Sequence, residues 1–567
     1  MSRFLTAEEC FVWPFYFPTV VPPAPWKGRD EGCYLTLPLP LVKHQEDDEQ
    51  IGPARDGADL AVVFEALNAL QETPWQWNAT IVELVRKARP EDKLPGLASD
   101  AEGAREERVS PEDAAFGERR AVESHGITSA MRLAILKRLE GDPEFWFPCQ
   151  LDWRGRAYAV PALIHPQSDD LGRALIRFSR GKPLEERGAF WLAVHLANLW
   201  GRDGIDKQPF EKRVRWVEEH RDEIADSAAR PLDGQRFWTR ADKPWCFLAA
   251  VKEWAGYLAA GPSFVSHLAV AMDGTCNGLQ HLSALGRDAE GGRWTNLVPS
   301  MEPHDIYQVV ADCLKRTAGD MARHEELART WLDLVDRRLV KEATMTTPYG
   351  VTDKGIHGQL VEQITTRFGG RFADVSKAAF YLGDMLKIAI DTVVVKAAEI
   401  RVWLRSVVRA LARQDRGVSW VTPAGFPVKH EARRLPERRV ETVLCSHVIY
   451  EGKGPKPMDV VQQENGIVPH LVHSLDAAHM MLTLCALKQR GLADFAMVHD
   501  SYAVHACDVD AMNAVLRDTF VEVHDRFTLA GFLADVRRAA PGVELPEPPA
   551  LGALDLATVR SSEYFFS

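Results

Sequence analysis

The feature that most constrains this chain is the stretch Phe264–Asp288, FVSHLAVAMDGTCNGLQHLSALGRD. It predicts a buried strand, an aspartate (Asp273) at the carboxyl end of that strand, a tight turn and an amphipathic helix. An acidic side chain at the end of a hydrophobic strand is well placed to hold a cation or to orient a substrate. On this stretch alone, the alternative that Asp273 simply caps the helix stays open.

A second aspartate lies in a similar setting far downstream. The stretch Ala496–Val504, AMVHDSYAV, predicts two short apolar strands joined by a tight hairpin with Asp500 at its tip. Mg²⁺ keeps several waters and binds one or two carboxylates plus substrate phosphates, so two aspartates brought together are enough for a two-metal site. In such a site one ion activates an attacking hydroxyl and the other neutralises a leaving pyrophosphate.

Between the two aspartates, the stretch Leu334–Gly350 predicts a helix with two cations on one face. Arg337 and Lys341 are four residues apart, so both project from one side and can bind the same phosphate chain. Tyr349 follows where neighbouring proline and glycine residues should end or distort the helix. A solvated basic face would explain the helix alone. The order acid, cationic helix with tyrosine, acid predicts a nucleotidyl transferase of the right-hand polymerase type.

Six blocks of the sequence resemble one known family, the single-subunit RNA polymerases of bacteriophages and mitochondria, from about Val20 to the last residue. DGTCNGLQHLSALGRD resembles its first catalytic motif, R-x-x-x-K with Tyr349-Gly350 its fingers-helix motif, and His499-Asp500-Ser501 its third motif. The other matching blocks are the template-contacting palm motif DWRGRAYAV (Asp152–Val160), the segment LVHSLDAAH (Leu471–His479) before the third motif, and the aromatic C-terminal foot Tyr564-Phe565-Phe566-Ser567.

The resemblance implies an α+β, mainly helical fold of the right-hand polymerase type, with palm, fingers and thumb and a small antiparallel palm sheet. The expected division along the chain is a residual N-terminal lead-in at 1–55, thumb helices at 56–142, a first palm part at 143–299, fingers at 300–473, and a second palm part with the C-terminal foot at 474–567.

Two regions carry more detailed expectations. Apolar periodicity predicts helices over Asp59–Arg89 and Ala114–Leu139, which would pair around the polar loop 90–112 as a thumb or as a purely structural hairpin. The span 429–465 contains the extended runs Val440–Ile449 and Met458–Val461, joined by Gly-Lys-Gly-Pro-Lys-Pro. These runs predict a β-hairpin with a basic tip, where the family places its promoter-specificity hairpin.

The resemblance also implies roles for single residues. Asp273, Asp500 and the Gly274 carbonyl are expected to hold two Mg²⁺, while Lys341 and Arg337 neutralise the nucleotide phosphates and Lys341 can protonate the leaving group. Tyr349 and His473 resemble the pair that selects for the ribose 2′-OH, and Tyr307 and Arg215 resemble residues near the incoming nucleotide. The expected nucleic-acid contacts are Arg154, Arg156, Arg173, Arg180, Lys182, Arg433 and Arg438.

Composition restricts the other function classes. No apolar run approaches the roughly 20 residues of a membrane span, and the start lacks the pattern of a signal peptide. The nine cysteines include no C-x-x-C pair, which gives no zinc signature and predicts reduced thiols. The net charge of −12 argues against a nucleic-acid partner, but basic residues concentrate in Arg401–Arg416 and Lys429–Arg439. The expected location is the cytoplasm, that of a host cell during phage infection.

The expected partners are a DNA template, an RNA product and ribonucleoside triphosphates, without a membrane. Phage relatives carry a large helical domain before the point that Val20 matches, and little here could encode it. The sequence therefore predicts that promoter opening needs a protein partner, supercoiling or a single-stranded template. Two alternatives stay open: a DNA polymerase of the related fold, which normally has a Glu shortly after the first aspartate that is absent here, and a non-catalytic nucleic-acid-binding subunit.

Overall fold

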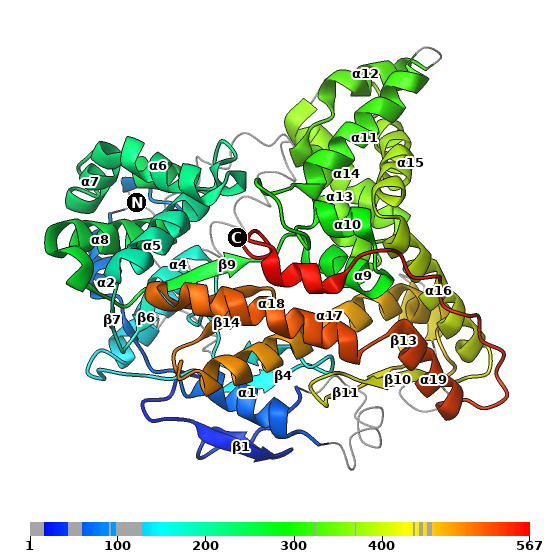
Figure 1. Ribbon diagram of the computed structural model, residues 1–567, viewed down its shortest axis with the longest axis horizontal. Coiled ribbons are helices and arrows are strands. Elements are labelled where there is room, and N and C mark those ends of the chain that lie inside the picture. Colours follow the sequence, from blue (N-terminus) through cyan, green and yellow to red (C-terminus); the bar gives the residue numbers. More distant parts are fainter. Residues whose placement is uncertain are drawn as a thin grey trace.

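The computed structural model describes residues 16–43, 59–89, 92–97, 128–322, 325–368, 370–434, 437–441, 446–450 and 456–567, with the backbone alone for 437–441 and 446–450. Two helical lobes rise from a common base, and the C-terminus lies between them (Figure 1). The described residues are mainly helical, with small antiparallel sheets. This confirms the predicted α+β fold class.

A three-stranded antiparallel sheet forms the centre of the base. Its strand order is β14 (Ala496–Val498), β15 (Ser501–His505), β9 (Ala269–Asp273). The register places Asp273 opposite Ser501, and a two-residue turn joins β14 to β15. His499 in that turn has a φ of 54°, the left-handed conformation that tight hairpin turns require. The predicted hairpin with Asp500 at its tip is therefore confirmed.

Helix α18 (Val509–Arg526) packs on β15 of this sheet, α17 (Val460–Gln489) reaches it through the His479 ring, which packs on that of Tyr502, and α9 (Asn277–Gly286) packs on α17. Every residue of α9 is buried, so the helix predicted after Asp273 is confirmed as a core element. Helix α17 contacts α1, α9, α16 and α18 and forms the long axis of the base. It continues through the boundary predicted between fingers and palm at 473/474, which therefore lies within one helix.

The lobe on the right of Figure 1 contains the residues predicted as fingers. It consists of α11 (Ile306–Met321), α12 (Glu326–Leu334), α13 (Arg337–Thr346), α14 (Asp353–Phe368) and α15 (Val375–Val393), and α16 (Val395–Ala412) leads back to the base. The opposite lobe consists of α5 (Glu185–Trp200), α6 (Phe210–Glu219), α7 (Arg221–Ala229) and α8 (Pro244–Ala260).

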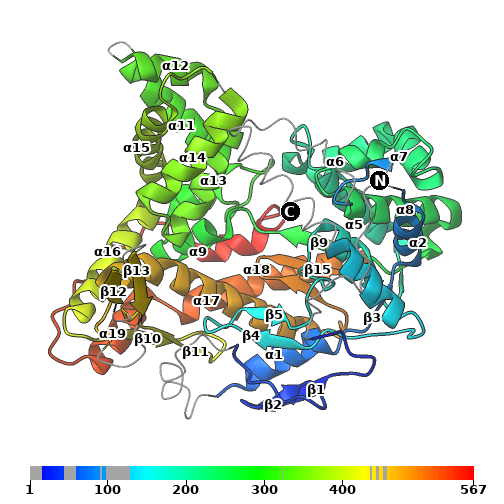
Figure 2. The ribbon, with the colours of Figure 1, turned by 180° about the vertical axis from the view of Figure 1, so that it is seen from behind.

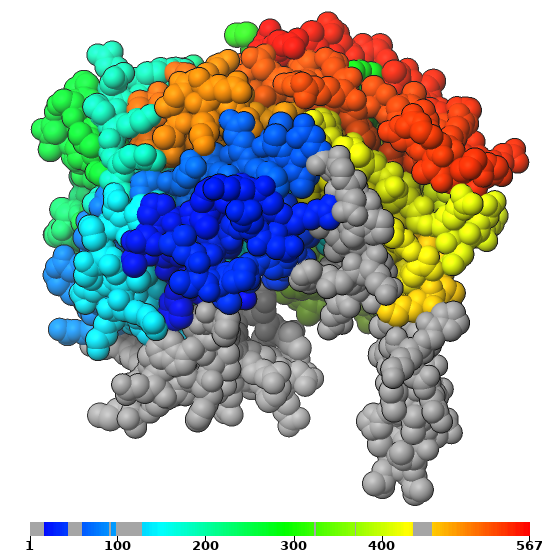
Figure 3. Space-filling view, turned by 90° about the horizontal axis from the view of Figure 1, so that it is seen from below, coloured from blue at the N-terminus to red at the C-terminus, as the bar shows by residue number. Residues whose placement is uncertain are grey.

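A lower layer lies beneath α17. Figure 2 shows α1 (Ala61–Gln71) and the hairpin of β4 (Cys149–Leu151) and β5 (Ala157–Ala159) below this helix. Figure 3 shows the first described residues, from 16 onward and in blue, on this underside. The Trp26 indole, which is buried, ties β1 (Ala24–Gly28) to β4 by donating to the Cys149 carbonyl over 3.0 Å. The N-terminal segment thereby stabilises the hairpin that carries residues 152–156.

Smaller elements connect these layers. They are β2 (Glu31–Cys33), α4 (Asp170–Ala174), β6 (Ile176–Phe178), β7 (Lys182–Pro183), β8 (Val265–Ser266), α10 (Ala289–Trp294), β10 (Val418–Val421), β11 (Pro427–His430), α19 (Leu529–Ala539) and the 3₁₀ helices η6 (Ile205–Lys207), η7 (Phe237–Arg240), η8 (Gly261–Ser263), η9 (Thr347–Tyr349), η10 (Ala506–Asp508) and η11 (Leu556–Ser561).

The helix predicted over Asp59–Arg89 is wrong in its middle. Strand β3 (Trp75–Trp77) separates α1 from α2 (Ala79–Lys87) and pairs with β6. The physical reason is Pro74, which cannot continue a helix, followed by Trp75, whose buried ring packs 4.9 Å from that of Phe178. Of the second predicted helix, residues 128–138 are helical. The predicted loop 90–112 lies largely outside the described residues, as does the start of that helix.

The predicted hairpin within 429–465 exists, but its strands are different. Strand β12 (Glu437–Glu441) pairs with β13 (Ser446–Tyr450), so the turn falls within 442–445, outside the described residues. The run Met458–Val461 is not a strand partner, because Asp459 caps α17 by accepting from the Gln462 amide over 3.0 Å. The predicted basic tip at 452–457 therefore does not join these two strands.

Candidate active site

The two predicted catalytic aspartates come together at one end of the central sheet. Asp273 ends β9, and Asp500 occupies the turn that precedes β15, the strand paired with β9. The Gly274 amide donates to the Asp500 carbonyl over 3.1 Å, which locks the two backbones side by side. Asp273 is exposed and Asp500 half-buried. Two residues far apart in the sequence therefore present carboxylates to the same space.

The electrostatic environment of Asp500 favours a bound cation. Burial, together with the carboxylates of Asp476 and Asp273, raises the pKa of Asp500 to about 7. A cation between the carboxylates would relieve that repulsion. No cluster of three or more His, Cys, Asp or Glu side chains with metal-binding geometry occurs in the described parts of the chain. This sparse set of oxygen donors fits Mg²⁺, which takes its remaining ligands from water and phosphate.

The C-terminal residues complete this end of the sheet. The Ser567 amide donates to the Asp273 carbonyl over 3.0 Å, and Phe566 forms a β-bridge with Gly274. The Phe566 ring is buried. The end of the chain is thereby placed beside Asp273.

A cavity of about 320 Å³ opens beside Asp273 and extends along the small side chains of the sheet toward the 185–260 lobe. Four cations line it, together with Ser567. Lys341, Lys243 and Arg173 have no carboxylate partner among the residues with described side chains, whereas Lys207 pairs with Asp206 over 3.1 Å. The cavity also contains Asp206 and Asp242, but Asp206 pairs with Lys207 and Asp242 with Arg202. A polyanionic group beside Asp273 would therefore find three cations that no ion pair among the described side chains holds.

Helix α13 carries the two residues predicted to bind phosphates, Arg337 and Lys341, and Lys341 lines the cavity. Asp336 caps the helix, which begins at Arg337 and places Lys341 one turn later, at the cavity. Burial and the neighbouring Arg337 and Lys207 lower the pKa of Lys341. The Arg337 Nε donates to the Asp305 carboxylate, and its Nη2 is buried without a partner among the described residues. The predicted spacing of two cations on one face is confirmed.

Tyr349 lies where the predicted helix break places it, in η9, before Gly350 with a φ of 74°. Gly278 of α9 permits this placement, because a Cβ at that position would come within 3.1 Å of the Tyr349 hydroxyl. The Tyr349 ring lies 4.7 Å from that of His473, and burial raises its pKa strongly. The predicted sugar-selecting pair, Tyr349 and His473, is therefore in contact.

Tyr307, predicted to lie near the incoming nucleotide, is buried, and its ring lies 5.4 Å from the Arg337 guanidinium.

The loop 152–156 meets α17 through three successive contacts, here called the ladder. Trp153 packs edge-on against His470, with ring centroids 4.1 Å apart. Arg154 Nη1 lies 2.7 Å from His473 Nδ1, and Arg156 Nη2 lies 2.7 Å from a carboxylate oxygen of Asp476. The three α17 residues are spaced by three, so they share one face of the helix.

The ladder changes the prediction for the two arginines. Arg156 is half-buried and pairs with the buried Asp476, and Asn277 donates to the other Asp476 oxygen over 2.9 Å. Both arginines therefore bind protein groups, and their contact with template stays a prediction. Asp476, which the sequence reasoning missed, is a third carboxylate near Asp500. Its signal was the HxxD spacing within LVHSLDAAH, three residues after His473.

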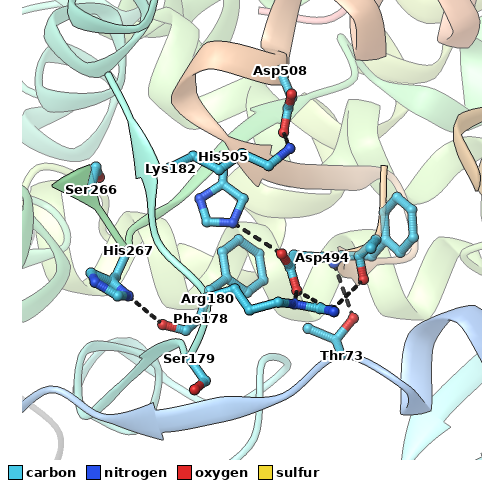
Figure 4. Close-up of polar contacts among 12 residues, drawn as sticks. Thr73, Phe178, Ser179, Arg180, Lys182, Ser266, His267, Asp494, His505 and Asp508 are labelled. Carbon is cyan, nitrogen blue, oxygen red and sulfur yellow. Dashed lines mark hydrogen bonds and ion pairs between the residues drawn. The ribbon is translucent and has the colours of Figure 1, made fainter. Parts of the chain in front are cut away.

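Arg180 and Lys182, predicted to contact nucleic acid, are neutralised inside the protein (Figure 4). Arg180 binds the buried Asp494 with Nε and Nη2, over 2.9 and 2.6 Å, and Lys182 binds Asp508 over 2.6 Å. Asp494 also lies 3.2 Å from His505 Nε2. Their predicted contact with nucleic acid stays untested and is weakened, because each charge already has a carboxylate partner.

The remaining predicted contacts differ in their placement. Arg173 lines the cavity beside Asp273. Arg433 is held by Glu431 and Asp415 over 2.5 and 3.1 Å, and the side chain of Arg438 lies outside the described residues. Arg215 is exposed on α6 and does not line the cavity. Lys207, the last residue of η6, lines it instead. Lys207 and Lys243 were not predicted, because neither belongs to a motif or is spaced in a recognisable pattern from another candidate residue.

Comparison with known proteins agrees with this geometry. A family model described as DNA-dependent RNA polymerase matches residues 182–542, and one described as DNA-directed RNA polymerase N-terminal matches residues 5–72. The chain belongs to the DNA-dependent RNA polymerase family. The second of these matches, at residues 5–72, overlaps the lead-in segment predicted at 1–55.

Similar proteins include DNA-directed RNA polymerase 1, mitochondrial, of Arabidopsis thaliana, 32% identical over 579 residues, 97% of this chain and 59% of that protein. DNA-directed RNA polymerase 1B, mitochondrial, of Nicotiana tabacum is 35% identical over 584 residues, 97% of this chain and 57% of that protein. DNA-directed RNA polymerase 2, chloroplastic/mitochondrial, of Nicotiana sylvestris is 33% identical over 579 residues. The chain spans somewhat under three fifths of the length of these relatives.

These relatives do not support the expected phage origin or a location in the cytoplasm of an infected host, because their names place them in plant mitochondria and chloroplasts. None of the described helices is long and apolar enough to cross a membrane.

Proposed function

We propose that this chain is a DNA-directed RNA polymerase that adds ribonucleotides to the 3′ end of an RNA on a DNA template and releases pyrophosphate. The observation that carries the proposal is the meeting of Asp273 and Asp500 at one end of the central sheet, with Asp273 lining a cavity that Lys341, Lys243 and Arg173 also line. Carboxylates for metal ions and uncompensated cations for a polyphosphate are the two requirements of nucleotidyl transfer.

Asp273, Asp500 and the Gly274 carbonyl would hold the metal, and we propose two Mg²⁺. Bound there, the ions would lower the pKa of the attacking hydroxyl and neutralise charge on the leaving group. Lys341 binds the phosphates, and its lowered pKa makes it a better proton donor to the departing oxygen. Arg337, whose Nε already binds Asp305, would contact the phosphate chain through Nη2, which has no partner among the described residues.

Tyr349 and His473 would contact the sugar. Their rings touch, and both are largely buried beside α9, where a ribose hydroxyl could replace water as a hydrogen-bond partner. The phenol and imidazole together favour a ribose over a deoxyribose, because the latter leaves polar groups unpaired. This assignment favours RNA synthesis over the alternative of DNA synthesis.

The test is extension of an RNA primer on a preassembled RNA–DNA scaffold, which avoids promoter opening. We expect Mg²⁺-dependent addition of the templated ribonucleotide, with deoxynucleotides added much more slowly. Efficient extension with deoxynucleotides alone would favour the DNA polymerase alternative, and no extension by folded protein would favour a non-catalytic subunit.

The requirement for a promoter-opening partner stays a prediction. It is tested by comparing run-off transcription by the isolated chain on matched duplex, supercoiled and single-stranded templates. Promoter-specific initiation on linear duplex by the chain alone would contradict it.

A further inference from the structure

Arg154 is held in one position by Asp152. The Asp152 carboxylate accepts hydrogen bonds from Arg154 Nε and Nη2 over 2.9 and 2.6 Å. It also accepts hydrogen bonds from the backbone amides of Arg154 and Arg156 over 2.9 and 3.0 Å. Gly155, with a φ of 95°, allows the tight loop, and a Cβ there would lie 3.0 Å from the Phe426 ring. The one guanidinium nitrogen left over, Nη1, points to His473.

This contact determines which ring nitrogen of His473 carries the proton. A guanidinium has only donors and stays charged, so the group it meets over 2.7 Å must be an acceptor. Nδ1 of His473 therefore carries a lone pair, and the proton of the neutral ring is on Nε2. Burial and the two cations Arg156 and Arg154 lower the pKa of His473 to about 2, which keeps the ring neutral.

The fixed tautomer leaves one donor, Nε2–H, on the side of the ring away from Arg154. Among the described residues this atom has no hydrogen-bond partner. The neighbouring Tyr349 ring, 4.7 Å away, places a phenol beside the same imidazole. A substrate atom that meets Nε2–H must be an acceptor, and the ribose 2′-oxygen is the acceptor that a deoxyribose lacks.

We propose that Arg154, held by Asp152, is a positioning residue that fixes His473 as the neutral Nε2–H tautomer and thereby sets the selectivity for ribonucleotides. The identity of the acceptor rests on the proposed function, whereas the tautomer does not. In the other tautomer Nε2 would be an acceptor, so the 2′-OH would have to donate its proton to the ring and the donor and acceptor roles of the ribose would be reversed.

The first experiment measures selectivity on the RNA–DNA scaffold as the ratio of kcat/KM for a ribonucleotide to that for its deoxy analogue. Arg154→Met removes the donor but leaves both backbone amides on Asp152. We expect the ratio to fall roughly tenfold, through slower ribonucleotide addition, with Arg154→Lys restoring part of it. The matched control is Arg187→Met on α5, which breaks an exposed ion pair with Asp510 of α18 and should leave the ratio unchanged.

The second experiment needs no catalysis. Imidazole ¹⁵N spectra of the histidine-labelled protein, with the His473 signals assigned by their loss in His473→Gln, should show a neutral ring protonated at Nε2. Arg154→Met should give a mixture of tautomers. A wild-type ring protonated at Nδ1, or an unchanged selectivity ratio in folded Arg154→Met, would overturn the inference. The expected spectra together with a wild-type protein that extends no primer would instead overturn the proposed function.

Discussion

Two groups of basic residues, both predicted from sequence to contact phosphates, have opposite surroundings in the structure. Lys341 and Arg173 line the cavity beside Asp273 and have no carboxylate partner among the residues with described side chains. Arg180 and Lys182, at the other end of the sheet, bind Asp494 and Asp508. Their charges are balanced before any ligand arrives. The difference shows that a cation indicates a phosphate site only where the fold leaves its charge uncompensated.

The largest expected effect concerns Asp273 and Asp500, the proposed metal ligands. Asp273→Asn and Asp500→Asn should each lower single-turnover ribonucleotide addition on the scaffold by roughly 10³-fold or more, because each removes a metal ligand. Asp508→Asn, in the balanced group, is the matched control and should retain nearly full activity. Comparable losses in all three variants would break the distinction between the two groups.

The next effect compares one cation from each group. Lys341→Met should lower kcat/KM for nucleotide addition by about 10²-fold, because it removes charge stabilisation at the leaving phosphates. Lys182→Met should change the same constant by no more than about twofold, because its charge is already paired with Asp508. Equal sensitivity of the two positions would show that Lys182 also contacts the substrates.

A smaller effect separates sugar selection from catalysis. Tyr349→Phe removes only the phenol, so ribonucleotide addition should slow little while discrimination against deoxynucleotides falls roughly tenfold. The measurement is competition between a ribonucleotide and its deoxy analogue on the scaffold. Unchanged discrimination would remove Tyr349 from the sugar site.

Stability should respond where activity does not. Arg180→Met leaves the buried Asp494 with His505 as its only side-chain partner among the described residues. Because the Arg180 side chain is half-exposed, we expect a loss of about 1–3 kcal/mol in the free energy of unfolding, measured by denaturant titration, with little change in scaffold affinity. A large loss of affinity at unchanged stability would return Arg180 to the nucleic-acid interface.

The raised pKa of Asp500 predicts a pH effect on stability without Mg²⁺. The folded state keeps a proton that the unfolded state releases between about pH 4 and 7, so the contribution of Asp500 to stability falls as pH rises through this range. Asp500→Asn cannot ionise, and its Tm should exceed that of the wild type at pH 8 and converge with it as the pH falls to about 4. Addition of Mg²⁺ should close the gap at pH 8. A gap independent of pH would contradict the assigned electrostatics.

Local patterns predicted the parts of the fold that depend on nearby residues. The strand–Asp–turn–helix unit around Asp273 and the hairpin at Asp500 formed as expected, because alternation and turn chemistry act over a few residues. The pairing of β12 with β13 was missed, because the run predicted as one strand, Val440–Ile449, contains parts of both strands and the residues that join them. The ladder was missed because it is a long-range contact: Arg156 and Asp476 meet only after α17 packs on the loop. Resemblance suggested Arg215, whereas the folded chain presents Lys207 to the cavity.

The central claim is that Asp273 and Asp500 form one metal site that faces the nucleotide. Mn²⁺ binding, measured by electron paramagnetic resonance with a non-hydrolysable ribonucleotide present, tests it most directly. We predict bound Mn²⁺ in the wild type, and clearly weaker binding in both Asp273→Asn and Asp500→Asn but not in Asp508→Asn. Unchanged Mn²⁺ binding in the first two variants, both folded, would contradict the claim.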